Sequence, residues 1–146
     1  MGLTAKALGI GSTYTFEKRV LHFCGWTQGV QAEFELYLED FALANARRLR
    51  KVTPNEELGQ GDPYLLTIRD INSGVYSFGG AACNAALRTD RHLKRAILIM
   101  LGETPGNGAV DYDLVEQIYE KDAEGLIRAM LAADHDPNSK APASTD

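Results

Sequence analysis

The sequence predicts a mainly α protein: a single compact domain of about five to six helices, with a short extended segment near its start. Three observations support this fold class. Apolar residues recur at three- and four-residue steps through most of the chain, as on amphipathic helices. Residues that typically start and end helices separate these stretches. The 146 residues, of which 45% are hydrophobic, suffice for one core without a metal or disulfide.

Both ends of the chain offer little to bury. We therefore place the domain at residues 13–133, between a flexible arm at residues 1–12 and a disordered acidic tail at residues 134–146. Within residues 13–20 the apolar side chains alternate with polar ones, which predicts a short extended segment or strand. Residues 21–30 contain two glycines and are expected to form a connector.

Residues 31–51 carry the clearest helical pattern in the sequence. The apolar stripe of this helix comprises Phe34, Leu38, Phe41, Ala42, Asn45 and Leu49. Acidic residues occupy its first half, and its basic end comprises Arg47, Arg48, Arg50 and Lys51. This charge order favours the helix dipole, so a solvated helix end is one interpretation of the four cations. A local nucleic-acid-binding patch is the other.

The middle of the chain predicts two further helices after a loop at residues 52–61. Asp62 is expected to cap the first of them, with Pro63 in its first position and Gly74 closing it in a left-handed conformation. The expected buried face of this helix comprises Tyr64, Leu65, Ile68 and Ile71.

The second of these helices is rich in small residues. Ser77 is expected to cap it, and it should extend to Leu87 with Gly79 and Gly80 in its interior. Two adjacent glycines are unfavourable inside a helix, so their expected benefit is close approach by a neighbour, as in a packing seam. A phosphate-binding loop is disfavoured because the sequence has no GxxxxGK[ST] or GxGxxG pattern.

Three helix starts are expected in the C-terminal part. Thr89 or Asp90 should cap a helix at residues 91–101, Asp111 a helix at residues 112–120, and Asp122 a final helix. Glycines and a proline interrupt the chain at residues 102–108, and Ala133 should be close to the last ordered residue.

Charge and composition limit the classes of partner. The net charge is -5 and the sequence pI is about 5.2, so the whole molecule is repelled by phosphate backbones at long range. The sequence shows no export signal and no apolar run of membrane-spanning length, which favours the cytoplasm. His22 and Cys24 alone offer too few ligands for a metal, so we expect neither a metal nor another cofactor.

A small cysteine-dependent enzyme is an alternative that the residues leave open. Cys24 or Cys83 would be the nucleophile and His22 or His92 the base. Both cysteines are instead expected to be reduced and buried among apolar neighbours. Since no arrangement of nucleophile, base and oxyanion donor is recognisable, we expect no enzymatic activity.

The order of elements resembles a known family. An aromatic extended segment (YTF) and an amphipathic helix precede a small-residue turn, which is followed by a basic-to-apolar helix, the stretch VDYDLVEQIYE and a closing helix. Over residues 13–133 this order is similar to that of the small helical tail assembly chaperones of long-tailed bacteriophages.

The resemblance implies a non-enzymatic assembly factor in the cytoplasm of a bacterial host. Proteins of this family coat the long helical tape measure protein and assist assembly of the tail tube. For such an adaptor we expect a protein client, self-association and a client-binding groove. The candidate groove residues are Tyr76, Phe78, Gly79 and Gly80, for which a place in the packed core is the alternative.

Overall fold

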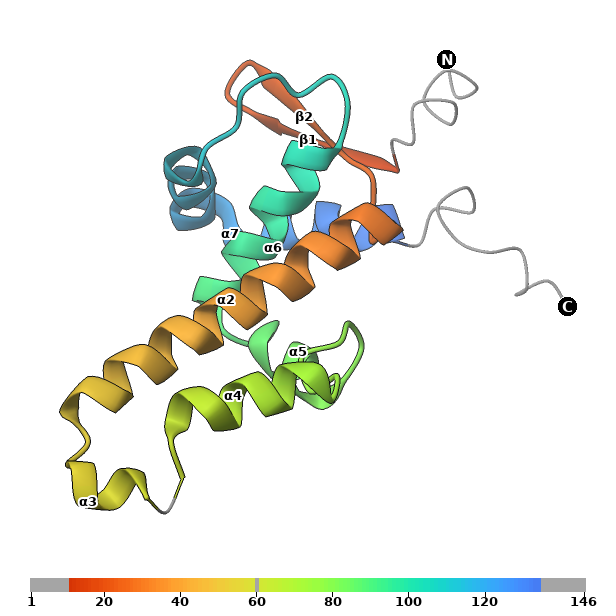
Figure 1. Cartoon of the computed structure of the whole chain (residues 1–146). Helices are drawn as coiled ribbons and strands as arrows, with labels where there is room; N and C mark the ends of the chain where they lie inside the picture. The colour runs from red at the N-terminus through yellow and green to blue at the C-terminus, as the bar shows by residue number, and fades with distance from the viewer. Residues whose placement is uncertain (1–10, 60, 135–146) are drawn as a thin grey trace, which may run out of the picture. The chain divides into compact units, whose positions relative to one another are not determined.

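The computed structural model describes residues 11–59 and 61–134, and it is mainly helical with one two-stranded sheet (Figure 1). The predicted fold class is confirmed. The described chain divides into two compact units, which we call unit 1 (residues 11–31 and 90–134) and unit 2 (residues 32–89). The single-domain boundaries remain a prediction, and most of the expected arm and tail lies outside the described residues.

Unit 1 begins with a β-hairpin. Strand β1 (Ser12–Phe16) pairs antiparallel with strand β2 (Arg19–Phe23), and Tyr14 lies opposite Leu21. The two strands are joined by a two-residue turn in which Glu17 has a positive φ of 56°. The hairpin occupies the region in which the sequence predicted one extended segment and a connector.

That prediction is wrong about residues 21–23, which belong to the second strand. The turn interrupts the alternation of apolar and polar residues. The inward-facing residues have even numbers in β1 and odd numbers in β2. Val20, the last apolar residue of the alternating stretch 13–20, is 46% exposed, whereas Leu21 and Phe23 are fully buried. A period-two pattern cannot be continued across a turn, because each strand sets its own phase.

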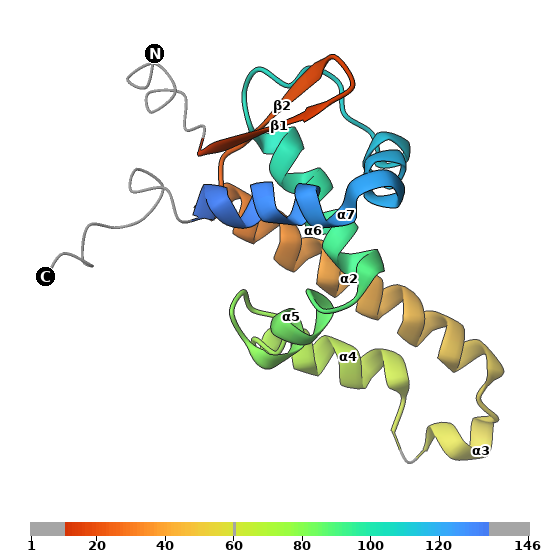
Figure 2. The same cartoon turned by 180° about the vertical axis from the view of Figure 1, so that it is seen from behind.

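Two helices complete unit 1, together with the first turn of α2. Helix α6 spans Asp90–Glu103 and helix α7 spans Tyr112–Asp134 (Figure 2). Both starts agree with the predicted ones, and the Asp111 carboxylate accepts the backbone N–H of Leu114 at 2.9 Å. Helix α6 extends two residues beyond its predicted end. The non-helical stretch predicted between these helices is also confirmed, at residues 104–111.

Helix α7 is kinked at Asp122, where the sequence predicted a new helix start. This residue has non-helical backbone angles (φ −155°, ψ 61°), and its carboxylate accepts the N–H of Gly125 at 3.1 Å. The hydroxyl of Tyr14 donates to the other carboxylate oxygen at 2.8 Å. Asp122 therefore caps the second half of α7 and also connects it to the hairpin.

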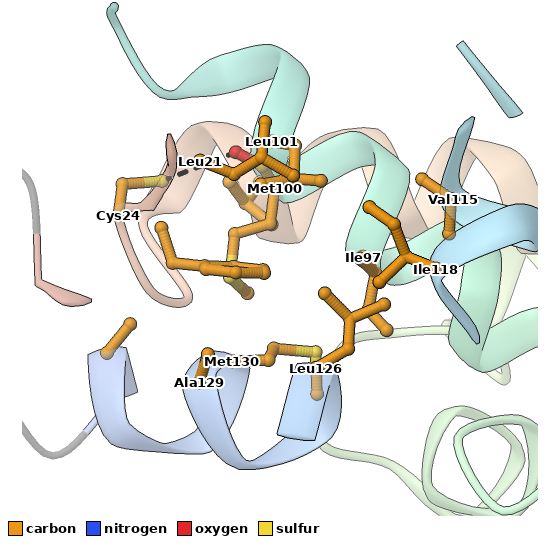
Figure 3. Packing of buried hydrophobic residues seen from close by; sticks show 13 residues of the cluster. Leu21, Cys24, Ile97, Met100, Leu101, Val115, Ile118, Leu126, Ala129 and Met130 are labelled. Atoms are coloured by element: carbon orange, nitrogen blue, oxygen red, sulfur yellow. Dashed lines mark hydrogen bonds between the residues drawn. The ribbon is translucent and has the colours of Figure 1, made fainter. Parts of the chain in front are cut away.

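The core of unit 1 is built mainly from β2, α6 and α7, as Figure 3 shows, and the first turn of α2 adds Val30. Side chains of the C-terminal half of α6 face those of the second half of α7. The fully buried members of this cluster are Leu21, Phe23, Val30, Ile97, Met100, Leu101, Val115, Ile118, Leu126 and Ala133. Unit 1 thus has a closed apolar core of its own.

Two tyrosines of unit 1 hold their protons unusually tightly. Burial and a hydrogen bond to Asp122 raise the pKa of Tyr14 to about 12. Burial and a 2.8 Å hydrogen bond to Asp90 likewise raise the pKa of Tyr119 to about 12. The neutral form of both phenols is therefore more strongly favoured in the folded protein than in the unfolded protein.

We expect the folded protein to lose stability as the pH rises from 10 towards 12. Because the folded-state pKa of each phenol lies above the ordinary value of 10.0, its contribution is complete below pH 10 and disappears as the pH approaches about 12. Tyrosinate absorbance should show two late-ionising groups, with Tyr14→Phe and Tyr119→Phe each removing one. If both variants keep the two late groups, the assignment is wrong.

Unit 2 contains most of helix α2 (Gln28–Val52), which confirms the most regular predicted helix. It continues with α3 (Asn55–Leu58), α4 (Pro63–Asn72) and α5 (Ala81–Ala86). The predicted loop at residues 52–61 is therefore wrong in part, since α3 lies inside it. The pattern of four residues is too short to carry a helical period.

The ends of α4 are as predicted, but its burial is not. The Asp62 carboxylate accepts the N–H of Tyr64 at 2.9 Å, Pro63 takes the first position, and Gly74 has a φ of 81°. No residue of α4 is buried, however, and Leu65 of the expected buried face is 62% exposed. The amphipathic pattern gives α4 an apolar side, but the described chain covers it only in part.

The double glycine lies outside helix α5, contrary to the prediction. Gly80 is the N-cap in an extended conformation, and Gly79 has a φ of 85°. An added Cβ on Gly79 would meet no atom within 4 Å, whereas one on Gly80 would lie 3.2 Å from the Ser77 carbonyl oxygen. Within the described chain the glycines therefore form a tight turn and no packing seam between helices, and Ser77 does not cap a helix.

Candidate interaction surface

Helices α2 and α4 form an antiparallel pair within unit 2. Near the end of α2, the Arg50 guanidinium pairs with the Asp62 carboxylate at 3.2 Å. Arg47 lies over the Tyr64 ring, 5.3 Å from its centroid. Beyond the far end of α4, the backbone N–H of Phe78 donates to a carboxylate oxygen of Glu35, at 2.6 Å. The chain after α2 thus runs back along it.

The predicted basic patch lies at the end of α2, and all four of its side chains are exposed. Two of them serve unit 2 itself, because Arg47 stacks on Tyr64 and Arg50 is paired with Asp62. A third, Arg48, donates to the side-chain oxygen of Asn45. Arg47 and Arg50 therefore stabilise the helix pair, which the sequence could not show because their partners Tyr64 and Asp62 come later in the chain.

Unit 2 carries an unusual amount of exposed aliphatic surface. Among the described residues, eight large hydrophobic side chains are exposed, and six of them belong to this unit. The six, exposed by between 40% and 77%, are Leu36, Leu49, Val52, Leu65, Leu66 and Val75. Exposed aliphatic side chains that gather in one region commonly mark a site of protein contact.

Four of these side chains lie at one end of the helix pair. We call Leu49, Val52, Leu65 and Leu66 the aliphatic end; the Arg50–Asp62 ion pair brings its two helix segments together. Leu49 continues the predicted stripe of α2, yet it is 54% exposed, whereas the stripe residue Phe34 is fully buried. The apolar face of α2 thus extends beyond the part that the folded chain covers. Sequence periodicity alone missed this, because it assigned Leu49 and Leu65 to the core.

The four predicted groove residues lie elsewhere, in the connection between α4 and α5. Tyr76 and Phe78 are half-buried, Gly79 is exposed and Gly80 caps α5. Burial and the negative charge of Asp70 raise the pKa of Tyr76. The structure brings these residues together in one turn, at the opposite end of α4 from Leu65 and Leu66.

Both thiols are buried. Cys24 is 5% exposed and its thiol donates to the Gly25 carbonyl at 3.4 Å, while Cys83 is fully buried. A reactive thiol needs an accessible and electropositive setting, which burial opposes. Burial and the positive charge of Arg91 lower the pKa of His92. In the part of the chain that the structure describes, no group of three or more potential ligands is placed to hold a metal ion.

A second surface feature is a charged hollow of about 490 Å³ between α6 and α7 in unit 1. Its acidic residues are partly compensated, because Lys94 pairs with Glu116 at 3.2 Å and Tyr119 donates to Asp90 at 2.8 Å. The lining comprises Asp90, Lys94, Asp113, Glu116, Gln117, Tyr119 and Glu120. These two contacts join α6 to α7.

Comparisons with protein-family models, with curated proteins and with solved structures find no match to this chain. Among residues 11–59 and 61–134, none of the helices has the length and apolar character needed to cross a membrane.

Proposed function

We propose that this protein is a non-enzymatic adaptor that binds a helical protein client through the aliphatic end of unit 2. The function is that of a tail assembly chaperone, with the tape measure and tail tube proteins as partners. The observation that carries the proposal is the uneven distribution of exposed aliphatic side chains, six of eight in unit 2. The family resemblance of the sequence supplies the kind of client.

Burial of these side chains would provide binding free energy. Moving a fully exposed leucine or valine out of water contributes about 1.5–3 kcal/mol, and the four side chains of the aliphatic end are 40–77% exposed. An amphipathic client helix places apolar anchors every three or four residues along one face. The apolar face of such a helix can contact both pairs of aliphatic side chains, the pair at the end of α2 and the pair at the start of α4.

The charges beside the aliphatic end indicate the sign of the client's polar side. Arg48 and Lys51 are exposed on the last turns of α2, next to Leu49 and Val52. Acidic residues flanking the apolar face of a client helix would be attracted to them. We expect these charges to affect the rate of association and its salt dependence more than the affinity.

The proposal predicts that Leu49→Ser with Leu65→Ser weakens client binding by about tenfold or more, because it removes two apolar contacts of a kcal/mol or so each. The matched control is Leu131→Ser, since Leu131 is 49% exposed but belongs to unit 1. Co-expression with a long helical protein of the tape measure type, followed by titration of its purified segments, measures the effect.

Equal binding by the double variant and the wild type would contradict the proposal. Circular dichroism should first show that the double variant keeps its helical content, as expected for exposed positions. Binding of DNA or RNA that falls steeply with salt and is lost in Arg48→Glu would instead support the nucleic-acid alternative.

A further inference from the structure

Helix α2, the long helix of Figure 1, has a polar face whose charges are arranged in mirror order. Acidic residues stand in its first half and basic residues in its last turns. The face, which we call the α2 charge face, comprises Glu33, Tyr37, Asp40, Ala44, Arg48 and Lys51. Tyr37 is half-buried and the other five are exposed.

These residues share one side of the helix. Glu33 and Lys51 are separated by 18 residues, which is five full turns at about 3.6 residues per turn, so their side chains leave the helix in the same direction. The intervening members follow at steps of three or four residues. In the described chain Glu33 and Lys51 make no ion pair, so both charges remain available to a partner.

The members of this face pair up around a single midpoint. Glu33 with Lys51, Tyr37 with Arg48, and Asp40 with Ala44 are each centred at about residue 42. Suppose that a second α2 packs antiparallel against the first, with the two helices crossing at this midpoint. Each acidic or aromatic residue of one copy then lies opposite a basic or small residue of the other. Ala44 at the crossing allows the two helix backbones to approach closely.

We propose that the α2 charge face binds a second copy of this chain, as an antiparallel helix pair with two-fold symmetry. Glu33 of each copy then pairs with Lys51 of the other. Tyr37, whose ring stacks on Phe34 at a centroid distance of 5.9 Å, is held in place to receive the guanidinium of Arg48 from the second copy. A two-fold interface uses the same patch twice, which a self-complementary charge order satisfies.

This interface does not involve the aliphatic end, although Arg48 and Lys51 lie beside both surfaces. It uses Glu33, Tyr37 and Lys51, whereas Leu49 belongs to the apolar stripe of Phe34 and Leu38 on another side of the helix. Because exposed ion pairs are individually weak, we expect a weak dimer that is populated at high protein concentration and low salt. It should weaken as the salt concentration rises, since screening reduces the attraction.

Charge exchange tests the antiparallel register. Glu33→Lys and Lys51→Glu should each weaken the dimer about tenfold or more, because each single change places like charges opposite one another twice per dimer. The double variant should restore the wild-type constant. An equimolar mixture of the two single variants should form a heterodimer of similar strength, since each lysine then meets a glutamate.

Sedimentation equilibrium of the full chain over about 1–500 µM measures these constants. Glu124→Lys, an exposed charge reversal in α7, is the control and should leave the dimer unchanged. Three outcomes would overturn the proposal: a wild-type protein that stays monomeric, single variants that associate as the wild type does, or a double variant that is not restored. Client binding by Glu33→Lys, a change near the start of α2 and away from the aliphatic end, shows separately whether the proposed function holds.

Discussion

Replacing Asn107 with alanine is expected to lower the free energy of unfolding by about 3–5 kcal/mol, a large effect for a loop residue. This side chain is only 6% exposed and makes three hydrogen bonds. Its amide nitrogen donates to the carbonyls of His22 and Leu101, each at 2.8 Å, and its oxygen accepts the His22 N–H at 2.7 Å. Alanine would leave these backbone groups without their partner in a buried setting.

Chemical denaturation measures this loss, and two variants sharpen it. Asn107→Asp keeps the size of the side chain and one acceptor but loses the donors, so it should destabilise by a similar amount. Asn72→Ala, at the exposed end of α4, should change the stability by no more than about 0.5 kcal/mol. If Asn107→Ala resembles Asn72→Ala, the loop is not held as described.

Leu126→Ala is expected to cost about 2–5 kcal/mol, because Leu126 is fully buried in the core of unit 1 and its truncation leaves a cavity. The same change at Leu65, which is 62% exposed, should cost no more than about 0.5 kcal/mol. The two substitutions are chemically identical, so the difference measures burial alone.

Chemical denaturation of both variants, monitored by circular dichroism, gives the two free energies of unfolding to compare. Similar losses at the two positions would show that Leu65 is covered in solution, and would contradict the exposed aliphatic end on which the proposed function rests. A small loss of stability in Leu65→Ala would agree with a role of Leu65 in binding rather than in folding.

The two units differ in how they are stabilised. Unit 1 combines a closed apolar core with hydrogen bonds that connect distant segments, as when Arg19 donates to the carbonyls of Asn107 and Ala109 at 2.8 and 2.6 Å. Unit 2 relies more on exposed polar contacts between its helices, such as the Arg50–Asp62 pair, in which the Arg50 side chain is 53% exposed. Such contacts are individually weak. We therefore expect unit 2 to depend more on its partners.

Local signals in the sequence are sufficient for three helix starts. Asp62, Asp111 and Asp122 were predicted as caps, and each accepts a backbone N–H from a residue two or three positions later. The end of α4 at Gly74 was predicted for the same reason, since its positive φ is a property of the glycine itself. The sequence misplaced the start of α5, because a capping serine and a glycine turn both precede it.

Tertiary structure alone decided which apolar and polar groups are covered. Periodicity placed Leu49 and Leu65 on apolar faces, but only the positions of the other helices show that both remain exposed. No sequence pattern near Asn107 predicts its hydrogen bonds to His22, which lies 85 residues away. The sequence by itself therefore determined the helical class, most helix starts and the charge order of α2. Burial and long-range bonding depend on which segments meet in space, and side-chain spacing carries no information about that.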